Sequence, residues 1–491
     1  MNAKPNIVVV MADQHRADML GCAGDPVIKT PHIDRLAREG VRFDRAYCQG
    51  PLCMPARASV LTERYVRDHG VFENRSQVAD GTPTFLHRIR AAGYRTSAIG
   101  KMHLWPHGLA QHQSTAAMRE VLVAYGFDDP IETVGKLASR AHDTPYTDYL
   151  RERGLLEVYR SFIAHNRLSG NRAGAPSWHA DPCPLPVEDY PDAWHGRRAA
   201  QWIDDYAGDA PFFLWVGFPG PHNPWDAPRE AVDQYRDAEI PMPRSLERPA
   251  VPAAGPFNLF LNAFLAHSDS STMTDEAIIA MRRAYYANVS VIDAGLGAIV
   301  SALARRQMLD NTWVVYTGDH GEMMGEHRML AKMVFYEPSV RVPLIVRPPG
   351  AMPARVVHER VQLMDLSATI RDIAGAGALT DSAANSLLPA IRDNRAPAAI
   401  PALVSENYGF AMFLADRYKL VVFEDTLEPG QLFDEIEDPA EDRNLCGDPA
   451  YAKVIDAMHE EHVAPFFKTA PLRPHPGLTS RIAARRAPVR G

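Results

Sequence analysis

A cysteine and an arginine stand four residues apart in the run GPLCMPARAS, residues 50–59. A helical pattern covers residues 56–64, and Pro55 suits the first turn of a helix because its missing N–H is not needed there. Cys53 is therefore predicted at or just before a helix N-terminus, where backbone N–H groups and the dipole favour negative charge. Arg57 follows one turn later, so both side chains can reach the same place. Such a pair could process an anion, but buried free cysteines are common, and these ten residues leave both interpretations open.

Two further pairs of polar residues come directly after apolar runs that read as buried strands: Asp13 with Gln14, and Asp319 with His320. In open α/β sheets, ligands bind at the carboxyl ends of the strands. The alternative for Asp13 is a helix cap, although no apolar helical period starts at once. Two aspartates, a carboxamide and an imidazole would together make a divalent-metal site.

Four basic residues are further candidates, and three of them follow strand patterns. Lys101 and His103 follow a strand pattern, and alternation predicts both on one side, an arrangement useful around an anion; a solvated strand end is the alternative. His222 follows another strand and is bracketed by two prolines that restrict its backbone, although a lone histidine is usually structural. Lys332 lies in a loop, and by itself it would be read as a solvated lysine.

The pattern of the elements predicts an α/β fold with a large, doubly wound, mixed but mostly parallel sheet. The expected strands are residues 7–12, 41–43, 95–100, 211–218, 313–317 and 342–346. The expected helices are residues 31–40, 82–92, 193–206, 275–308 and 451–461. In such a sheet the polar strand ends can converge on one edge. Residues from about 111 to 192 are expected to be irregular insertions that cover the sheet edge, because Pro, Gly, His and Arg are frequent there.

From about residue 399 onward, close-spaced strand patterns with short turns predict a smaller antiparallel sheet. We therefore expect two domains: a catalytic domain, 1–398, and a small C-terminal α+β domain with a terminal tail, 399–491. The tail from residue 468 has five arginines and no acid, which fits either disorder or an arm that packs on a neighbouring subunit of a homo-oligomer.

The composition excludes several classes of protein. With 52 basic and 60 acidic residues among 491, the net charge is −8, so no nucleic-acid partner is expected. The five cysteines are odd in number and lack C-x-x-C spacing, which argues against a disulfide framework or a zinc finger. The apolar segment 7–12 is too short for a signal or membrane segment, so we expect a soluble cytoplasmic protein without a membrane partner; export without a leader is the alternative.

Residues 53–57 resemble the Cys-x-Pro-x-Arg signature of the type I sulfatases, which belong to the alkaline-phosphatase-like superfamily. The resemblance covers nearly the whole chain, because the polar pairs and basic residues follow in the family's order, and residues 31–40 and 432–445 also look like family signatures. It implies that a formylglycine-generating enzyme oxidises Cys53 to formylglycine, whose hydrate is the nucleophile. The implied substrate is a small-molecule sulfate ester.

The resemblance also implies roles for the other residues. The implied ligands of one divalent metal ion are Asp13, Gln14, Asp319, His320 and the modified Cys53. The metal would lower the pKa of one hydroxyl of the hydrate, which attacks sulfur. The implied contacts of the sulfate oxygens are Arg57, Lys101 and Lys332; His222 would protonate the leaving oxygen, and His103 would help to expel sulfate.

Two residues depart from the usual sulfatase pattern. The family often has an acid at the position of Gln14 and asparagine at that of His320; these changes favour Mn²⁺ over Ca²⁺, and both are met, like Ala56, in phosphonate monoester hydrolases. Lys101 and His103 favour a sulfate ester, because that branch tends to have neutral residues there. We therefore expect an arylsulfatase-like hydrolase, with a phosphonate monoester or phosphodiester hydrolase with promiscuous sulfatase activity as the runner-up. A non-catalytic protein that binds a metal and an oxyanion is a third hypothesis, against which the intact set of cations argues.

Overall fold

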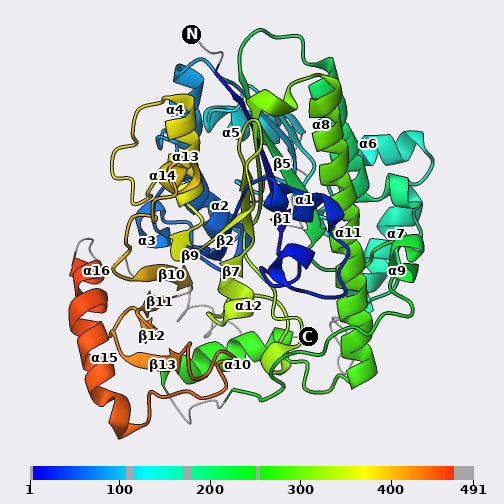
Figure 1. The fold of residues 1–491 in the computed structure, drawn as a ribbon. Coiled ribbons are helices and arrows are strands. Elements are labelled where there is room, and N and C mark those ends of the chain that lie inside the picture. The colour runs from blue at the N-terminus through cyan, green and yellow to red at the C-terminus, as the bar shows by residue number, and fades with distance from the viewer. Residues whose placement is uncertain (1–3, 107–114, 170–179, 250–254, 408, 469–491) are drawn as a thin grey trace.

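The computed structural model of the chain describes residues 4–106, 115–169, 180–249, 255–407 and 409–468 (Figure 1). The predicted fold class is confirmed: a large, mixed, mostly parallel sheet lies between helices, and a separate four-stranded antiparallel sheet follows it. The predicted tail beyond residue 468 lies outside the described residues, and so do parts of the predicted insertion region.

The large sheet has the strand order β4-β3-β5-β1-β6-β8-β2-β7, and β9 pairs with β2. Its strands are β1 Asn6–Asp13, β2 Val41–Tyr47, β3 Arg95–Gly100, β4 Asp129–Glu132, β5 Phe212–Pro221, β6 Thr312–Gly318, β7 Arg341–Val342, β8 Leu344–Arg347 and β9 Arg355–Gln362. Strand β1 is parallel to both of its neighbours, β5 and β6, whereas β7 and β8 run antiparallel to β2. The expected strand 342–346 is divided into β7 and β8 at Pro343, which has no N–H to donate to a ladder.

Alternation along β1 explains why helices cover both faces of the sheet. Val8 and Val10 point into one apolar cluster, while Ile7 and Val9 point into another. The helices on the first face are α1 Pro31–Arg38, α8 Pro191–Asp205 and α11 Asp275–Arg305 (Figure 1). The helices on the second face are α2 Cys53–Thr62, α4 Phe85–Ala91, α13 Asp365–Ala374 and α14 Leu388–Arg392.

Helix α11 is by length and composition apolar enough to cross a membrane, with a mean hydropathy of 1.6 in its most apolar stretch of 18 residues. However, 67% of that stretch is buried inside the protein, and the helix packs along α8. Burial of this kind is typical of a core helix.

The prediction that residues from about 111 to 192 are irregular is wrong for the described part of this region. It contains α5 Thr115–Ala124, β4, α6 Pro145–Glu152 and α7 Leu156–Ser169. Pro145 does not break a helix but starts one, because it occupies the first turn behind the capping residue Thr144. Strand β4 extends the large sheet at its edge beside β3.

The small sheet has the strands β10 Leu403–Asn407, β11 Phe410–Ala415, β12 Tyr418–Phe423 and β13 Pro429–Asp434 in sequential order. One face is covered by α15 Ala452–Met458, a π-helical turn at His459–Val463, and α16 Ala464–Lys468. The other face joins the apolar core of the large sheet. The domain division at residue 398 stays a prediction. The remaining α-helices are α3 Val66–His69, α9 Arg229–Asp233, α10 Pro256–Ser268 and α12 Glu337–Val340.

Candidate active site

The predicted start of a helix at Cys53 is confirmed, because Cys53 is the first residue of α2 and Pro55 lies in its first turn. The thiol is buried, with Sγ 3.2 Å from Nε2 of His320 and 3.7 Å from Oδ1 of Asp13. The sulfur therefore faces the ends of the central strands rather than the apolar core. Of the two interpretations of this cysteine, the geometry favours a chemical role.

Asp13, Cys53, Asp319 and His320 each offer one ligand atom, and these four atoms lie within 4.8 Å of one another. Sheet register explains this convergence. Strands β1 and β6 are parallel neighbours, and Ala12 lies opposite Gly318. The next residue on each strand, Asp13 or Asp319, therefore lies at the same edge of the sheet. The Nδ1 atom of His320 lies 2.9 Å from the carbonyl oxygen of Gly321, which leaves Nε2 to face the thiol. Carboxylates together with an imidazole fit a divalent cation, so the residues present fit the implied metal.

Gln14 lies between two charged groups. Its backbone N–H donates to Oδ1 of Asp319 over 2.9 Å, its side-chain Nε2 donates to Glu322, and its Oε1 accepts from Lys332. Because a carboxylate only accepts and an ammonium only donates, the two neighbours fix the orientation of the amide. The buried Glu322 was not among the predicted site residues, although it follows Asp319-His320-Gly321 directly in the sequence.

Arg57 and Lys101 connect the two aspartates. Arg57 donates from Nε to Oδ2 of Asp319 over 2.8 Å and from Nη2 to Oδ2 of Asp13 over 3.2 Å. Nζ of Lys101 lies 2.5 Å from the same oxygen of Asp13. Burial would raise the pKa of Asp13, but the positive charges of Lys101 and Arg57 hold it well below its usual value. Asp13 is therefore a carboxylate in the folded protein.

Lys332 and His222 form a second pair beside Gln14. Nζ of Lys332 lies 2.8 Å from Nε2 of His222, whose Nδ1 lies 2.6 Å from the carbonyl oxygen of Asn223. Burial, and then the charges of Lys332 and Lys101, lower the pKa of His222 well below its usual value. The neutral imidazole of His222 thus accepts a hydrogen bond from the ammonium of Lys332. The pair holds one proton between Nζ of the lysine and Nε2 of the histidine. The reading of Lys332 as a solvated lysine is wrong, since it is buried.

The argument that placed Lys101 and His103 on one side of a strand is wrong. Strand β3 ends at Gly100, and His103 has a left-handed backbone with φ of 48°. The loop is instead held by Glu132 at the end of β4, whose carboxylate accepts from the backbone N–H groups of Met102 and His103. His103 is buried, and its positive φ interrupts the strand-like alternation.

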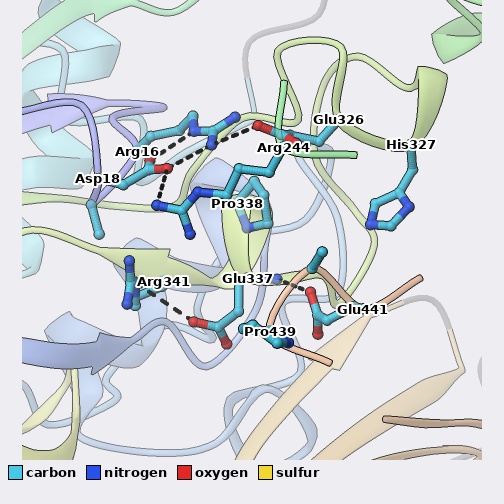
Figure 2. A pocket seen from close by; sticks show the side chains of 12 residues that line it. Arg16, Asp18, Arg244, Glu326, His327, Glu337, Pro338, Arg341, Pro439 and Glu441 are labelled. Carbon is cyan, nitrogen blue, oxygen red and sulfur yellow. Dashed lines mark hydrogen bonds and ion pairs between the residues drawn. The ribbon is translucent and has the colours of Figure 1, made fainter. Parts of the chain in front are cut away.

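A charged pocket is lined partly by residues of the loops that follow β1 and β6 (Figure 2). It is lined by Arg16, Ala17, Asp18, Arg244, Glu326, His327, Glu337, Pro338, Arg341, Pro439, Ala440 and Glu441. Arg16 is already paired there, 2.7 Å from Asp18 and 3.1 Å from Glu326. The pocket includes neither the thiol nor the candidate metal ligands, so the chemistry is assigned to the cluster around Cys53.

Comparison with known proteins adds family evidence to this geometry. The profile of the sulfatase family matches residues 5–376, and that of the C-terminal region of N-sulphoglucosamine sulphohydrolase matches residues 325–465. The chain is 29% identical over 382 residues to an arylsulfatase of Clostridium perfringens, a match that covers 76% of the chain and 75% of the relative. It is 29% identical over 461 residues to a choline-sulfatase of Rhizobium meliloti, covering 91% of the chain and 83% of the relative.

Solved structures give the same fold. A phosphonate monoester hydrolase from Silicibacter pomeroyi superposes with a TM-score of 0.78 at 26% identity, covering 95% of this chain and 96% of that one. A phosphonate monoester hydrolase of Agrobacterium radiobacter superposes with a TM-score of 0.77 at 24% identity, covering 95% and 96% of the two chains.

Proposed function

Because the chain belongs to the sulfatase family of the alkaline-phosphatase-like superfamily and is a sulfuric ester hydrolase, we propose that it hydrolyses aryl sulfates with a formylglycine made from Cys53. The observation that carries the proposal is the position of the Cys53 sulfur, 3.2 Å from His320 and 3.7 Å from Asp13 at the start of α2. A partner formylglycine-generating enzyme would supply the oxidation.

The residues that would hold the metal are Asp13, Gln14, Asp319, His320 and the modified residue 53. A bound divalent ion would supply Lewis acidity that makes an oxygen nucleophile available at neutral pH. The loss of one negative charge at Gln14 and the softer imidazole nitrogen of His320 favour Mn²⁺ over Ca²⁺.

The cations of the chain would bind and orient the sulfate group. Arg57 and Lys101 are already fixed by their contacts with Asp13 and Asp319, so little reorganisation is needed when an oxyanion arrives. Lys332 would contact the same group from the side of Gln14. The Lys332–His222 pair would give its proton to the leaving oxygen as the S–O bond breaks, and His103 would assist the release of sulfate.

The test is sulfate release from an aryl sulfate together with mass analysis of the peptide that contains Cys53. The expected result is turnover by protein in which the Cys53 peptide carries the aldehyde or its hydrate. Fully active protein with an unmodified cysteine would refute the mechanism. If the Cys53→Ala variant bound the ester as the parent does and the parent turned over nothing, the non-catalytic hypothesis would replace it.

A phosphonate monoester or phosphodiester hydrolase with promiscuous sulfatase activity is the second candidate. The observation in its favour is the Gln14 amide held between Glu322 and Lys332 in place of an acid, together with the likeness to the Silicibacter pomeroyi enzyme. Comparing kcat/KM on matched aryl sulfate, phosphonate and phosphodiester substrates decides between the two. A higher kcat/KM for the phosphonate or the diester would make the sulfatase activity the secondary one.

We also propose that the protein acts in the cytoplasm as a homo-oligomer, without nucleic-acid or membrane partners. The acidic net charge of −8 supports the first exclusion. Light scattering of the purified protein would test the assembly, and cell fractionation would test the location.

A further inference from the structure

A buried lysine, Lys136, lies behind the loop that carries His222. Its ammonium is 2.7 Å from the carbonyl oxygen of Pro224, 2.8 Å from Oδ1 of Asp226 and 3.1 Å from the hydroxyl of Tyr190. The side chains of Lys136 and Asp226 are only 1% and 0% exposed. Two of these contacts hold the chain two and four residues after His222.

The other end of the same loop is held by Asp192, at the start of α8. Its Oδ1 accepts the N–H of Gly220 over 2.9 Å. A Cβ atom at Gly220 would lie 2.6 Å from the carboxylate of Asp192, so glycine permits this close approach. The His222 loop is therefore fixed two residues before the imidazole and two residues after it.

Burying the charges of Lys136, Asp192 and Asp226 costs free energy, and the geometry that they define explains why they are present. Placing a lysine and two aspartates in the protein interior loses their hydration, and apolar residues of similar size would often stabilise a fold as well. Oδ2 of Asp192 and Oδ2 of Asp226 have no hydrogen-bond partner among the described residues. Lys136 forms an ion pair with Asp226, and its charge opposes burial, which raises the pKa of Asp192 to about 6. Directional contacts to the loop backbone are what these charges provide and apolar residues would not.

The segment that carries Lys136, residues 132–136, also contacts the loop of Lys101. Glu132 accepts from the N–H of Met102, and a Cβ atom at Gly135 would lie 3.2 Å from Nζ of Lys101. Residues 132–136, which continue from edge strand β4, thus contact two loops that carry predicted site residues. Glu132 holds the loop of Lys101, and Lys136 holds the loop of His222.

We infer that Lys136 is a positioning residue that, with Asp226 and Asp192, aims His222 at the leaving oxygen of the substrate. The inference rests on the proposed function, in which the Lys332–His222 pair gives a proton to that oxygen. Misplacing the imidazole of His222 should then lower kcat/KM only when the leaving group needs a proton. A phenolate of low basicity leaves without one, whereas a basic phenolate does not.

The test is the Lys136→Met variant measured on 4-nitrophenyl sulfate and on phenyl sulfate, whose leaving group is more basic. We expect kcat/KM to fall about tenfold or more for phenyl sulfate and less than about twofold for 4-nitrophenyl sulfate, since general acid catalysis contributes about 10²–10⁴-fold. Equal losses on both esters, or no loss on either, would overturn the inference. If the parent prefers phosphonates, the matched aryl phosphonates replace the sulfates.

Removing one charge from a buried network can prevent folding, so a second variant is needed. The double variant Lys136→Met/Asp226→Asn neutralises both members of the ion pair, and it must show the same selective loss. The matched control is Lys419→Met, which removes another buried lysine far along the chain and must leave the ratio between the two esters unchanged. A parent that hydrolyses neither ester nor phosphonate would contradict the proposed function itself, which separates the two failures.

Discussion

Lys101 and Lys419 are both buried lysines with carboxylate partners, but of these two only Lys101 lies in the candidate active site. Lys419, on β12, is surrounded by Glu337, Glu435 and Glu441 at distances of 2.8, 3.5 and 2.6 Å. Lys101 lies 2.5 Å from Asp13. Burial of an ammonium beside carboxylates is therefore common to both regions and does not identify a site.

The neighbours of the carboxylates separate the two regions. Around Lys101, the aspartates also bind Arg57 and face a thiol and an imidazole, groups that can act as nucleophile, ligand or acid. Around Lys419, two of the three acids also have arginine partners: Glu435 pairs with Arg45 of β2, and Glu337 pairs with Arg341 of β7. These ion pairs connect the small sheet to the large one. Glu337 and Glu441 also line the charged pocket (Figure 2). The first region thus has the composition of a reaction site, and the second that of a structural junction.

The largest expected effect is in the first region. Cys53→Ala removes the nucleophile, and we expect activity to fall by about 10⁴–10⁶-fold, as is typical when a covalent nucleophile is removed. Cys446→Ala, which changes a cysteine in the C-terminal part of the chain, is the matched control and should stay within about twofold of the parent. Initial rates on the preferred ester measure both; residual activity in Cys53→Ala above about 1% of the parent would contradict the assignment.

Arg57→Lys tests whether geometry or charge matters around Lys101. A lysine keeps the charge but cannot reproduce the contacts of the planar guanidinium with Asp13 and Asp319. We expect kcat/KM to fall about 10²–10³-fold, the usual effect of losing a group that stabilises a transition state. A loss of less than about threefold, at unchanged metal content, would mean that position 57 needs only a positive charge.

The effect of Lys419→Met should be seen in stability rather than in catalysis. Removing one partner of a buried ion pair leaves the other charges uncompensated, which destabilises by about 3–5 kcal/mol. Urea unfolding should show this loss, while kcat/KM at a temperature where the variant is folded stays within about threefold of the parent. A variant with parental stability and much lower kcat/KM would reverse the roles assigned to the two regions.

The acids around Lys419 should have a smaller effect, which is a dependence of the free energy of unfolding on pH. Burial raises the pKa of Glu441 to about 7, although Lys419 opposes it, from an ordinary value of 4.5. Between these pH values the folded protein binds a proton that the unfolded chain has lost, so the free energy of unfolding falls as pH rises through this interval. Glu441→Gln should make that fall shallower in urea titrations between about pH 5 and pH 8, and an identical pH slope in the variant would contradict the argument.

The sequence predicted the edge of the sheet at which the polar strand ends meet, because the signals for it are local. Apolar runs predicted β1 and β6, and the polar residue after each run is at the edge where the ligands converge. The order of β-strands in a parallel sheet then brings residues 13 and 319 together, although they are 306 positions apart. These local signals were therefore sufficient to predict that Asp13, Cys53, Asp319 and His320 lie close together.

The supporting residues could not be predicted in the same way. Lys136 and Asp226 are 90 positions apart and meet only because β4 pairs with β3 at the edge of the sheet. A four-residue strand that contains a proline has too weak a pattern to be recognised. Glu322 carried a signal, since it follows the polar pair after β6, but its contact with Gln14 depends on the fold of two separate loops.

In the proposed active site, Asp13, Gln14, Asp319, His320 and residue 53 enclose one divalent cation. Anomalous X-ray diffraction from crystals grown with Mn²⁺ tests it most directly. We expect a single strong peak among these five side chains. A peak among Glu337, Glu435 and Glu441 instead, or no bound cation in catalytically active crystals, would contradict it.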